Sequence, residues 1–311
     1  MQYVKRVSLP LQRIKWLIVA CAMLCNTAKA QSGFLPPSDR YRSDRLTQVV
    51  IAESLVLAAT SIGLYFLWYK KFPKSKFHRF NDSKAWLQVD KIGHATAAYN
   101  IASLQYDLMR WSGVQTNDAI LTASLTSLAY MGLIEVMDGF SRDWGYSQSD
   151  MFANLSGVGL FAAQQYGWSD QRIHLKMSAR YTPFARQNGA LLGNNFASRL
   201  LKDYNGQTYW LSFNIASFLP AASKVPHWAQ LSLGYGATGM IHSEIKENSL
   251  FPASKETRYR RFFIAPDVDW SRLNVPSVPA AGFYLTRFIK TPAPAIEFNR
   301  NEKVKLRWIY F

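Results

Sequence analysis

Three short stretches between positions 90 and 157 carry the side chains whose types and spacing suit chemistry. They hold eight polar residues: Asp90, Lys91, His94, Glu135, Asp138, Ser147, Asp150 and Asn154. A histidine beside carboxylates can move a proton, activate water or bind a divalent ion. The same groups can instead pair with one another and fix the ends of helices. The residue types alone leave both interpretations open.

Three predicted helices position these side chains. They cover 90–111, 117–137 and 150–166, and each is apolar and rich in small residues, which is typical of closely packed helices. Short connections make successive helices antiparallel neighbours, so the first begins, the second ends and the third begins at one end of a bundle. Asp90 and His94 lie four residues apart, and therefore share a helix face. The pattern predicts that the eight polar residues converge at that end.

Each residue of this group also has a purely structural explanation. Asp90 can cap its helix, and the spacing of Ser147 and Asp150 is that of a capping box. Glu135, near a helix C-terminus, opposes the helix dipole by ~0.3–1 kcal/mol and needs a cationic partner, for which Lys91 and His94 are the candidates. We therefore favour a polar clamp that holds the bundle end.

The alternative is a catalytic site with His94 as base or ligand. Glu135 and Asp150 are then its carboxylate partners. A single histidine among carboxylates is a weak metal signature, so the sequence predicts neither a metal nor another cofactor.

Residues 1–30 have the three parts of a signal peptide for Sec-type export. Basic residues precede a short apolar run, and Ala28-Lys29-Ala30 fits a cleavage site. Both cysteines lie in this leader, so the mature chain has no disulfide or thiolate site. Leu24 before Cys25 is a poor fit to the small residue that lipidation requires. Residues 31–42, with Pro36-Pro37, are predicted to form a flexible lead-in.

The formal net charge of +16 does not indicate nucleic-acid binding. The leader has five basic residues and no acidic one, so the charge without it is +11. Much of the remainder lies in 70–79 and 258–261, and in an exported protein such patches meet anionic headgroups. The predicted partners are membrane lipid or an envelope protein, not nucleic acid, and the sequence leaves the oligomeric state open.

Residues 43–168 are predicted to form a membrane-associated helical bundle. A further helix from 45 to 69 precedes the three already described, and its uncharged part is short for a bilayer. Complete spans and a compact, partly embedded bundle both remain open.

Residues 169–311 are predicted to form an antiparallel β-rich region. Apolar and polar residues alternate over 173–181, 209–215, 231–235 and 303–310, and a short helix is expected within 187–203. The fold class is therefore α+β. The strands either cover the bundle or insert in the outer membrane, where a strand ending in an aromatic residue such as Phe311 is typical.

The spaced polar pattern resembles the signature of the uncharacterised YfiM-like envelope family. It consists of Asp90-Lys91-Ile92-Gly93-His94, Glu135-x-x-Asp138-Gly139 and Ser147-x-x-Asp150-x-x-x-Asn154. It is similar, more loosely, to VanZ-like membrane proteins. The resemblance covers about 86–168 and implies an envelope protein of unestablished role.

The sequence therefore predicts a structural or interaction protein of the envelope, located in the outer membrane or periplasm or, alternatively, in the inner membrane. The alternative function is a membrane-associated hydrolase acting on a lipid or cell-wall precursor.

Overall fold

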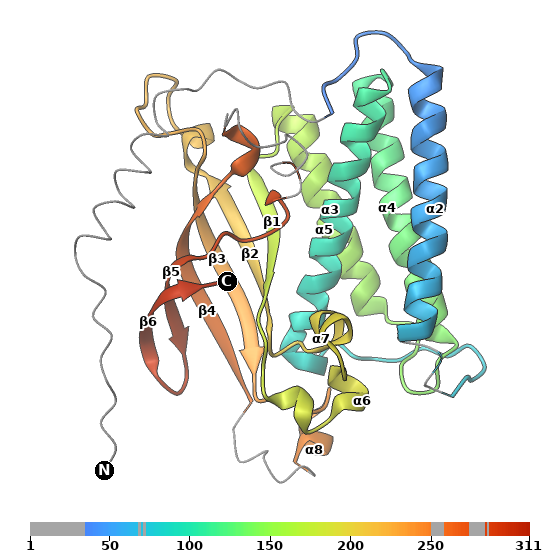
Figure 1. Cartoon of the computed structure of the whole chain (residues 1–311), viewed down its shortest axis with the longest axis vertical. Helices are drawn as coiled ribbons and strands as arrows, with labels where there is room; N and C mark the ends of the chain where they lie inside the picture. The colour runs from blue at the N-terminus through green and yellow to red at the C-terminus, as the bar shows by residue number, and fades with distance from the viewer. Residues whose placement is uncertain (1–34, 68–69, 71–72, 250–257, 274–283, 285) are drawn as a thin grey trace.

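The computed structural model describes residues 35–67, 70, 73–249, 258–273, 284 and 286–311. The fold is α+β, with a helical region followed by an antiparallel sheet, as the sequence predicts (Figure 1). The proposed leader and the first residues of the lead-in lie outside the described residues. Residues 35–42, the rest of the lead-in, have no regular helix or strand.

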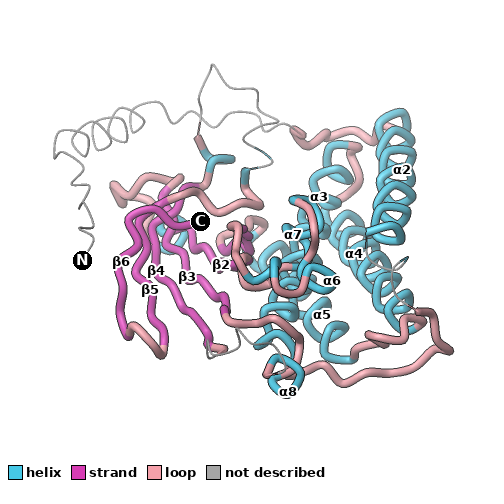
Figure 2. Tube along the Cα trace, turned by 60° about the horizontal axis from the view of Figure 1, so that its bottom comes forward, coloured by secondary structure: helices cyan, strands magenta, loops and turns pink. Residues whose placement is uncertain are grey.

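Four long helices form the bundle: α2 (Ser43–Leu67), α3 (Val89–Trp111), α4 (Thr116–Gly139) and α5 (Gln148–Trp168). Shorter helices are α6 (Gly189–Leu192), α7 (Phe196–Lys202) and α8 (Ile245–Asn248), with 3-10 turns at Ala85–Gln88, Phe184–Arg186, Ile215–Phe218 and Trp270–Arg272. Figure 2 shows the long helices on one side of the molecule and most of the sheet on the other, with α2 at the outer edge of the bundle.

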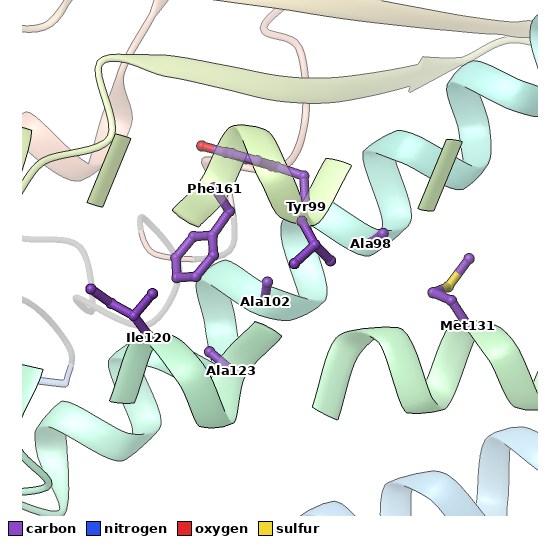
Figure 3. Close-up of a cluster of buried hydrophobic side chains, with 8 residues drawn as sticks. Ala98, Tyr99, Ala102, Ile120, Ala123, Met131 and Phe161 are labelled. Carbon is purple, nitrogen blue, oxygen red and sulfur yellow. The ribbon is translucent and has the colours of Figure 1, made fainter. Parts of the chain in front are cut away.

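The bundle core lies between α3, α4 and α5. Its buried side chains are Ala98, Tyr99, Ala102, Ile120, Ala123, Met131, Val158 and Phe161, most of which are labelled in Figure 3. The alanines let the helix backbones approach, as the small-residue pattern predicts. Ser127 donates a hydrogen bond from its hydroxyl to the Ala98 carbonyl oxygen at 2.7 Å, directly across α3 and α4.

Two of the described helices are long and apolar enough to cross a membrane, judged by length and composition alone. They are Ser43–Phe66 of α2, which is almost entirely unburied, and Thr116–Gly139 of α4, which is also a partly buried core helix. Lipid-facing helices and the core helices of soluble proteins share this length and composition.

The sheet has six antiparallel strands in sequence order: β1 (Ile173–Ala179), β2 (Gln207–Asn214), β3 (Ala229–Thr238), β4 (Tyr259–Val268), β5 (Ala293–Asn299) and β6 (Lys303–Tyr310). The alternation of residue types locates β1, β2, β3 and β6, but not β4 or β5. In β4 the sequence reads Arg260-Arg261-Phe262-Phe263. Arg261 and Phe263 are buried, whereas Arg260 and Phe262 are exposed on the other face. Neighbouring residues are therefore alike, which hides the period of two.

The sheet buries its polar face. In β1, His174, Lys176 and Ser178 are buried, while the apolar residues between them are only partly so. The apolar face of β1 and β2 packs on the bundle, where Tyr99 of α3 donates a hydrogen bond to the Ile173 carbonyl oxygen at 3.0 Å. Val89, Tyr209, Ala237 and Met240 form a further apolar contact between α3 and the sheet region. The same face of the later strands extends beyond the helices.

Candidate functional site

The polar cluster lies where α3 begins, α4 ends and α5 begins, at the lower end of the bundle in Figure 1. Ser147 caps α5, because its hydroxyl oxygen accepts a hydrogen bond from the Asp150 backbone N–H at 3.1 Å. Gly157 allows α5 to approach α3: a Cβ atom there would lie 2.0 Å from the Ala95 carbonyl oxygen. The close approach of these two helices brings their polar residues into contact.

Lys91 is the cationic centre of the cluster. Its Nζ lies 2.6 Å from Asp82 Oδ2, 2.9 Å from Asp90 Oδ2 and 2.6 Å from Asp150 Oδ1. These carboxylates come from the loop before α3, from α3 itself and from α5. One ammonium group therefore ties together three parts of the chain.

His94 contacts the carboxylate from α4. Its Nδ1 lies 3.5 Å from Glu135 Oε1 and 3.2 Å from Asn154 Oδ1. Glu135 is 1% exposed, and its Oε2 accepts a hydrogen bond from the Ser147 backbone N–H at 3.2 Å. Its Oε1 has no hydrogen-bond partner among the described residues. The other ring nitrogen of His94, Nε2, lies 3.9 Å from Asp90 Oδ1 and 4.0 Å from Asp150 Oδ1. His94 therefore contacts Glu135 and also lies near two of the aspartates that Lys91 binds.

The structure thus brings together seven of the eight residues singled out in the sequence. The eighth, Asp138, lines the cavity beside the cluster and acts electrostatically on Glu135. Two further members were missed. Asp82 accepts hydrogen bonds from the hydroxyls of Ser147 (2.6 Å) and Ser149 (2.8 Å), and the Tyr204 hydroxyl donates to Asp90 Oδ1 at 2.7 Å. Neither belongs to a periodic segment, so spacing gives no signal for them.

Burial and an excess of acid set the proton affinities of this site. Burial raises the pKa of Glu135 to about 8, and His94 opposes the shift only in part. Burial and the charge of Asp90 raise the pKa of Asp150 to about 7. For His94, burial alone lowers the pKa, but attraction to Asp90, Asp150 and Glu135 outweighs it and the pKa is raised. The cluster therefore holds protons near neutral pH.

A cavity of about 1000 Å³ opens beside the cluster. Its lining includes Asp90, His94 and Asp150 of the cluster together with the apolar side chains of Met131, Ile134, Met177, Leu200, Leu201 and Phe288. A largely apolar cavity with a few converging polar groups is the usual form of a small-molecule site. The titratable groups are thus accessible from a space that fits an amphiphile.

One subset of the cluster has the spacing of a metal site. Single ligand atoms of Asp90, His94 and Asp150 lie within 4.8 Å of one another. However, Lys91 Nζ lies 2.6 Å from Asp150 Oδ1, so an ammonium group already neutralises this position. A divalent ion has to displace it or accept strong repulsion, and the donor set fits a metal poorly.

The fold and the site together define an α+β protein with a buried, titratable cluster at one end of a helical bundle. Residues 79–166 of this chain match a protein family described as "Predicted periplasmic lipoprotein (DUF2279)", whose function is unknown. The match covers α3, α4 and all but the last two residues of α5, and it includes every residue of the cluster except Tyr204. It supports a place in the periplasm or cell envelope.

No curated protein and no solved structure matches the chain. The family description names lipoproteins, and of the two cysteines of this chain only Cys21 follows a small residue, Ala20. Both cysteines lie outside the match and outside the described residues.

Proposed function

We propose that the protein is a structural or interaction protein of the cell envelope, and that its polar cluster clamps the end of the helical bundle. The observation that carries this proposal is the position of Lys91 between Asp82, Asp90 and Asp150. Without the ammonium group of Lys91, these buried carboxylates would lose the cation that they share, and an unpaired buried charge lowers the free energy of unfolding by several kcal/mol. The Tyr204–Asp90 hydrogen bond extends the clamp to the segment before β2.

The clamp predicts a large stability difference between two lysines seven residues apart. Lys91→Met leaves three carboxylates without their shared cation, and we expect the free energy of unfolding to fall by about 3 kcal/mol. Lys84→Met changes an exposed lysine of the preceding loop and should stay within about 0.5 kcal/mol of wild type. Thermal and denaturant melts of the full chain measure both. Equal melting of the two variants would reject the clamp.

The second candidate is a membrane-associated hydrolase acting on a lipid or cell-wall precursor. The observation that favours it is the pair of carboxyl groups with pKa values of about 8 (Glu135) and about 7 (Asp150) beside His94. His94 and Asp150 line an amphiphile-sized cavity, and Glu135 lies buried behind His94. Groups that exchange protons near neutral pH suit general acid–base catalysis. In this proposal His94 is the base, and Glu135 and Asp150 are its partners.

Replacing His94 separates the two functions. As part of a clamp, His94→Gln lowers the melting temperature, because the buried Glu135 and Asn154 lose the imidazole ring that they contact. As part of an enzyme, the same change leaves stability nearly intact and removes hydrolysis of a lipid or cell-wall precursor. Melting curves and hydrolysis assays on one preparation read out both. Loss of stability without any hydrolysis by the wild-type protein would exclude the hydrolase.

We also propose three more specific assignments. They are membership of the YfiM-like group, the looser likeness to VanZ-like proteins, and an outer-membrane or periplasmic rather than inner-membrane location. Membrane fractionation with protease accessibility tests the location directly.

A further inference from the structure

The outward face of the sheet is apolar across all six strands. Its central row runs through Leu175, Leu211, Leu233, Ile264, Ile296 and Leu306, which are register partners in turn. A parallel row runs through Met177, Tyr209, Tyr235, Phe262, Phe298 and Val304. The bundle covers the β1 and β2 end of these rows, and β3 to β6 extend past it.

Eight large side chains on this extension are exposed to solvent. They are Leu231, Leu233, Phe262, Ile264, Ile296, Phe298, Val304 and Leu306, each between 36% and 62% exposed. We call them the apolar sheet face. The opposite face of the sheet is not available for contact with another molecule, because it is buried and holds ion pairs such as Lys176 with Asp267 and Arg261 with Glu297. A contiguous apolar patch of this kind marks an interaction surface.

A basic rim borders the apolar sheet face where β4 begins and the β5–β6 turn lies. Arg258, Arg260, Arg300 and Lys303 line a hollow of about 430 Å³ together with Phe262 and Phe298. Among the described residues, no carboxylate forms an ion pair with any of these four cations. The Nε and Nη1 atoms of Arg258 are buried, and no described residue forms a hydrogen bond with them. Among the described residues, these cations therefore lack a direct ion-pair partner, although Glu244 and Glu247 act electrostatically on Arg258, and they adjoin exposed phenylalanine rings.

A second apolar surface has its basic edge at the same end of the molecule. Helix α2 exposes Val50, Leu55, Ile62 and Phe66. It ends near Lys70 and Lys74, whose Nζ atoms lie over the rings of Phe66 and Tyr65. Figure 1 shows the end of α2 and the β5–β6 turn both in the lower half of the molecule. The sheet face and helix α2 are thus oriented alike: each is apolar along its length and has its basic residues at the lower end in the view of Figure 1.

We propose that the apolar sheet face docks on a lipid membrane, with the basic rim at anionic headgroup phosphates. Acyl chains cover the eight apolar side chains, and each cation of the rim adds about 1 kcal/mol of attraction to an anionic surface. β6 is an edge strand without a further strand partner among the described residues. Unpaired backbone groups are not tolerated in the hydrocarbon core, so the face lies at the membrane surface and does not cross the bilayer. The net positive charge of the chain opposes a second copy at this face.

Vesicle flotation with the full chain tests this proposal. The probes are phosphatidylcholine vesicles with and without 30 mol% phosphatidylglycerol, an amount on the order of the anionic content of natural membranes. We expect Arg300→Glu with Lys303→Glu to weaken binding to the anionic vesicles at least about 10-fold, and Lys224→Glu, at the opposite end of the sheet, to leave it unchanged. Phe298→Asp with Leu306→Asp should abolish binding to both vesicle types.

Three outcomes would overturn the proposal. The first is equal flotation of the rim variant and the wild type, which assigns binding to α2. The second is equal loss with Lys224→Glu, which shows a general effect of net charge. The third is a dimer in sedimentation that Phe298→Asp with Leu306→Asp converts to monomer while vesicle binding persists, which assigns the face to a second copy. Unchanged melting of each variant shows that the changes act at the surface.

Discussion

The bundle end and the buried face of the sheet both hold charged side chains, but they balance charge differently. In the sheet, Asp267 lies 2.8 Å from Lys176 Nζ and 3.5 Å from Lys290 Nζ. Glu297 lies 2.6 Å from Arg261 Nε and 2.7 Å from Arg307 Nε. Each carboxylate there has two cations. At the bundle end, Asp82, Asp90, Asp150 and Glu135 share Lys91 and His94.

This difference in balance sets the protonation of the two regions. Burial alone raises the pKa of Glu297, but Arg261 and Arg307 outweigh it and lower the pKa to about 2. Burial likewise opposes Lys176 and Lys290 at Asp267, whose pKa is lowered. At the bundle end, too few cations remain for Glu135 and Asp150, and their pKa values reach about 8 and about 7. The sheet network is therefore fixed in charge, and the bundle cluster is titratable.

The largest expected effect comes from removing a carboxylate of the sheet. Asp267→Asn leaves Lys176 and Lys290, both fully buried, without a counter-ion, and we expect a loss of about 3–5 kcal/mol in the free energy of unfolding. Asp143→Asn, at an exposed ion pair with Arg142, should cost less than about 1 kcal/mol. Denaturant unfolding of both variants measures the difference. A mild Asp267→Asn phenotype would contradict the fixed-charge description of the sheet.

A smaller effect is expected from separating the two helices that build the bundle cluster. Gly157→Ala places a Cβ atom 2.0 Å from the Ala95 carbonyl oxygen, so α5 has to move and stability should fall by about 1–3 kcal/mol. Gly159→Ala is the matched control, since a Cβ there meets nothing within 4 Å. It should raise stability by up to about 1 kcal/mol through helix propensity. If both variants shift the melting temperature in the same direction relative to wild type, the close approach of α3 and α5 is ruled out.

The last expected effect is a change in the pH dependence of stability, which the bundle end controls. Folding raises the pKa of Glu135 from 4.5 to about 8, so its stabilising contribution is complete below pH 4.5 and is lost as the pH rises through 8. Asp150 and His94, whose pKa values are also raised, act in the same direction. One pKa unit corresponds to about 1.4 kcal/mol of stability. If only half of the rise in the pKa of Glu135 is realised, the free energy of unfolding still falls by about 2 kcal/mol between pH 5 and pH 9.

Glu135→Gln should therefore stabilise the protein relative to wild type at pH 9 and leave it nearly unchanged at pH 5. Melting temperatures across this range measure the effect. Glu297→Gln is the control from the sheet, because the pKa of Glu297 is about 2 and its charge is constant over the same interval. A wild-type melting temperature that does not fall between pH 5 and pH 9 would remove the distinction between the two regions.

The helices of the cluster could be predicted from the sequence to within about two residues. Small residues and apolar periodicity locate α3, α4 and α5, and short connections require their ends to meet. The spacing of Asp90 with His94 then places both on one face, where the structure has them. By contrast, Asp82 and Tyr204 lie outside regular periods, so no local pattern assigns them to the cluster.

For the sheet, the sequence determined that residues alternate but not which face is buried. A period of two is the same whether the apolar or the polar residues point inward. Only the tertiary structure placed Lys176 beside Asp267 and Arg261 beside Glu297, partners 91 and 36 residues apart in the chain. Local residue order specifies helices, strands and the polar residues on each, because their periods are short. The pairing of buried charges depends on how distant strands and helices meet, and that pairing decided which carboxylates keep a proton.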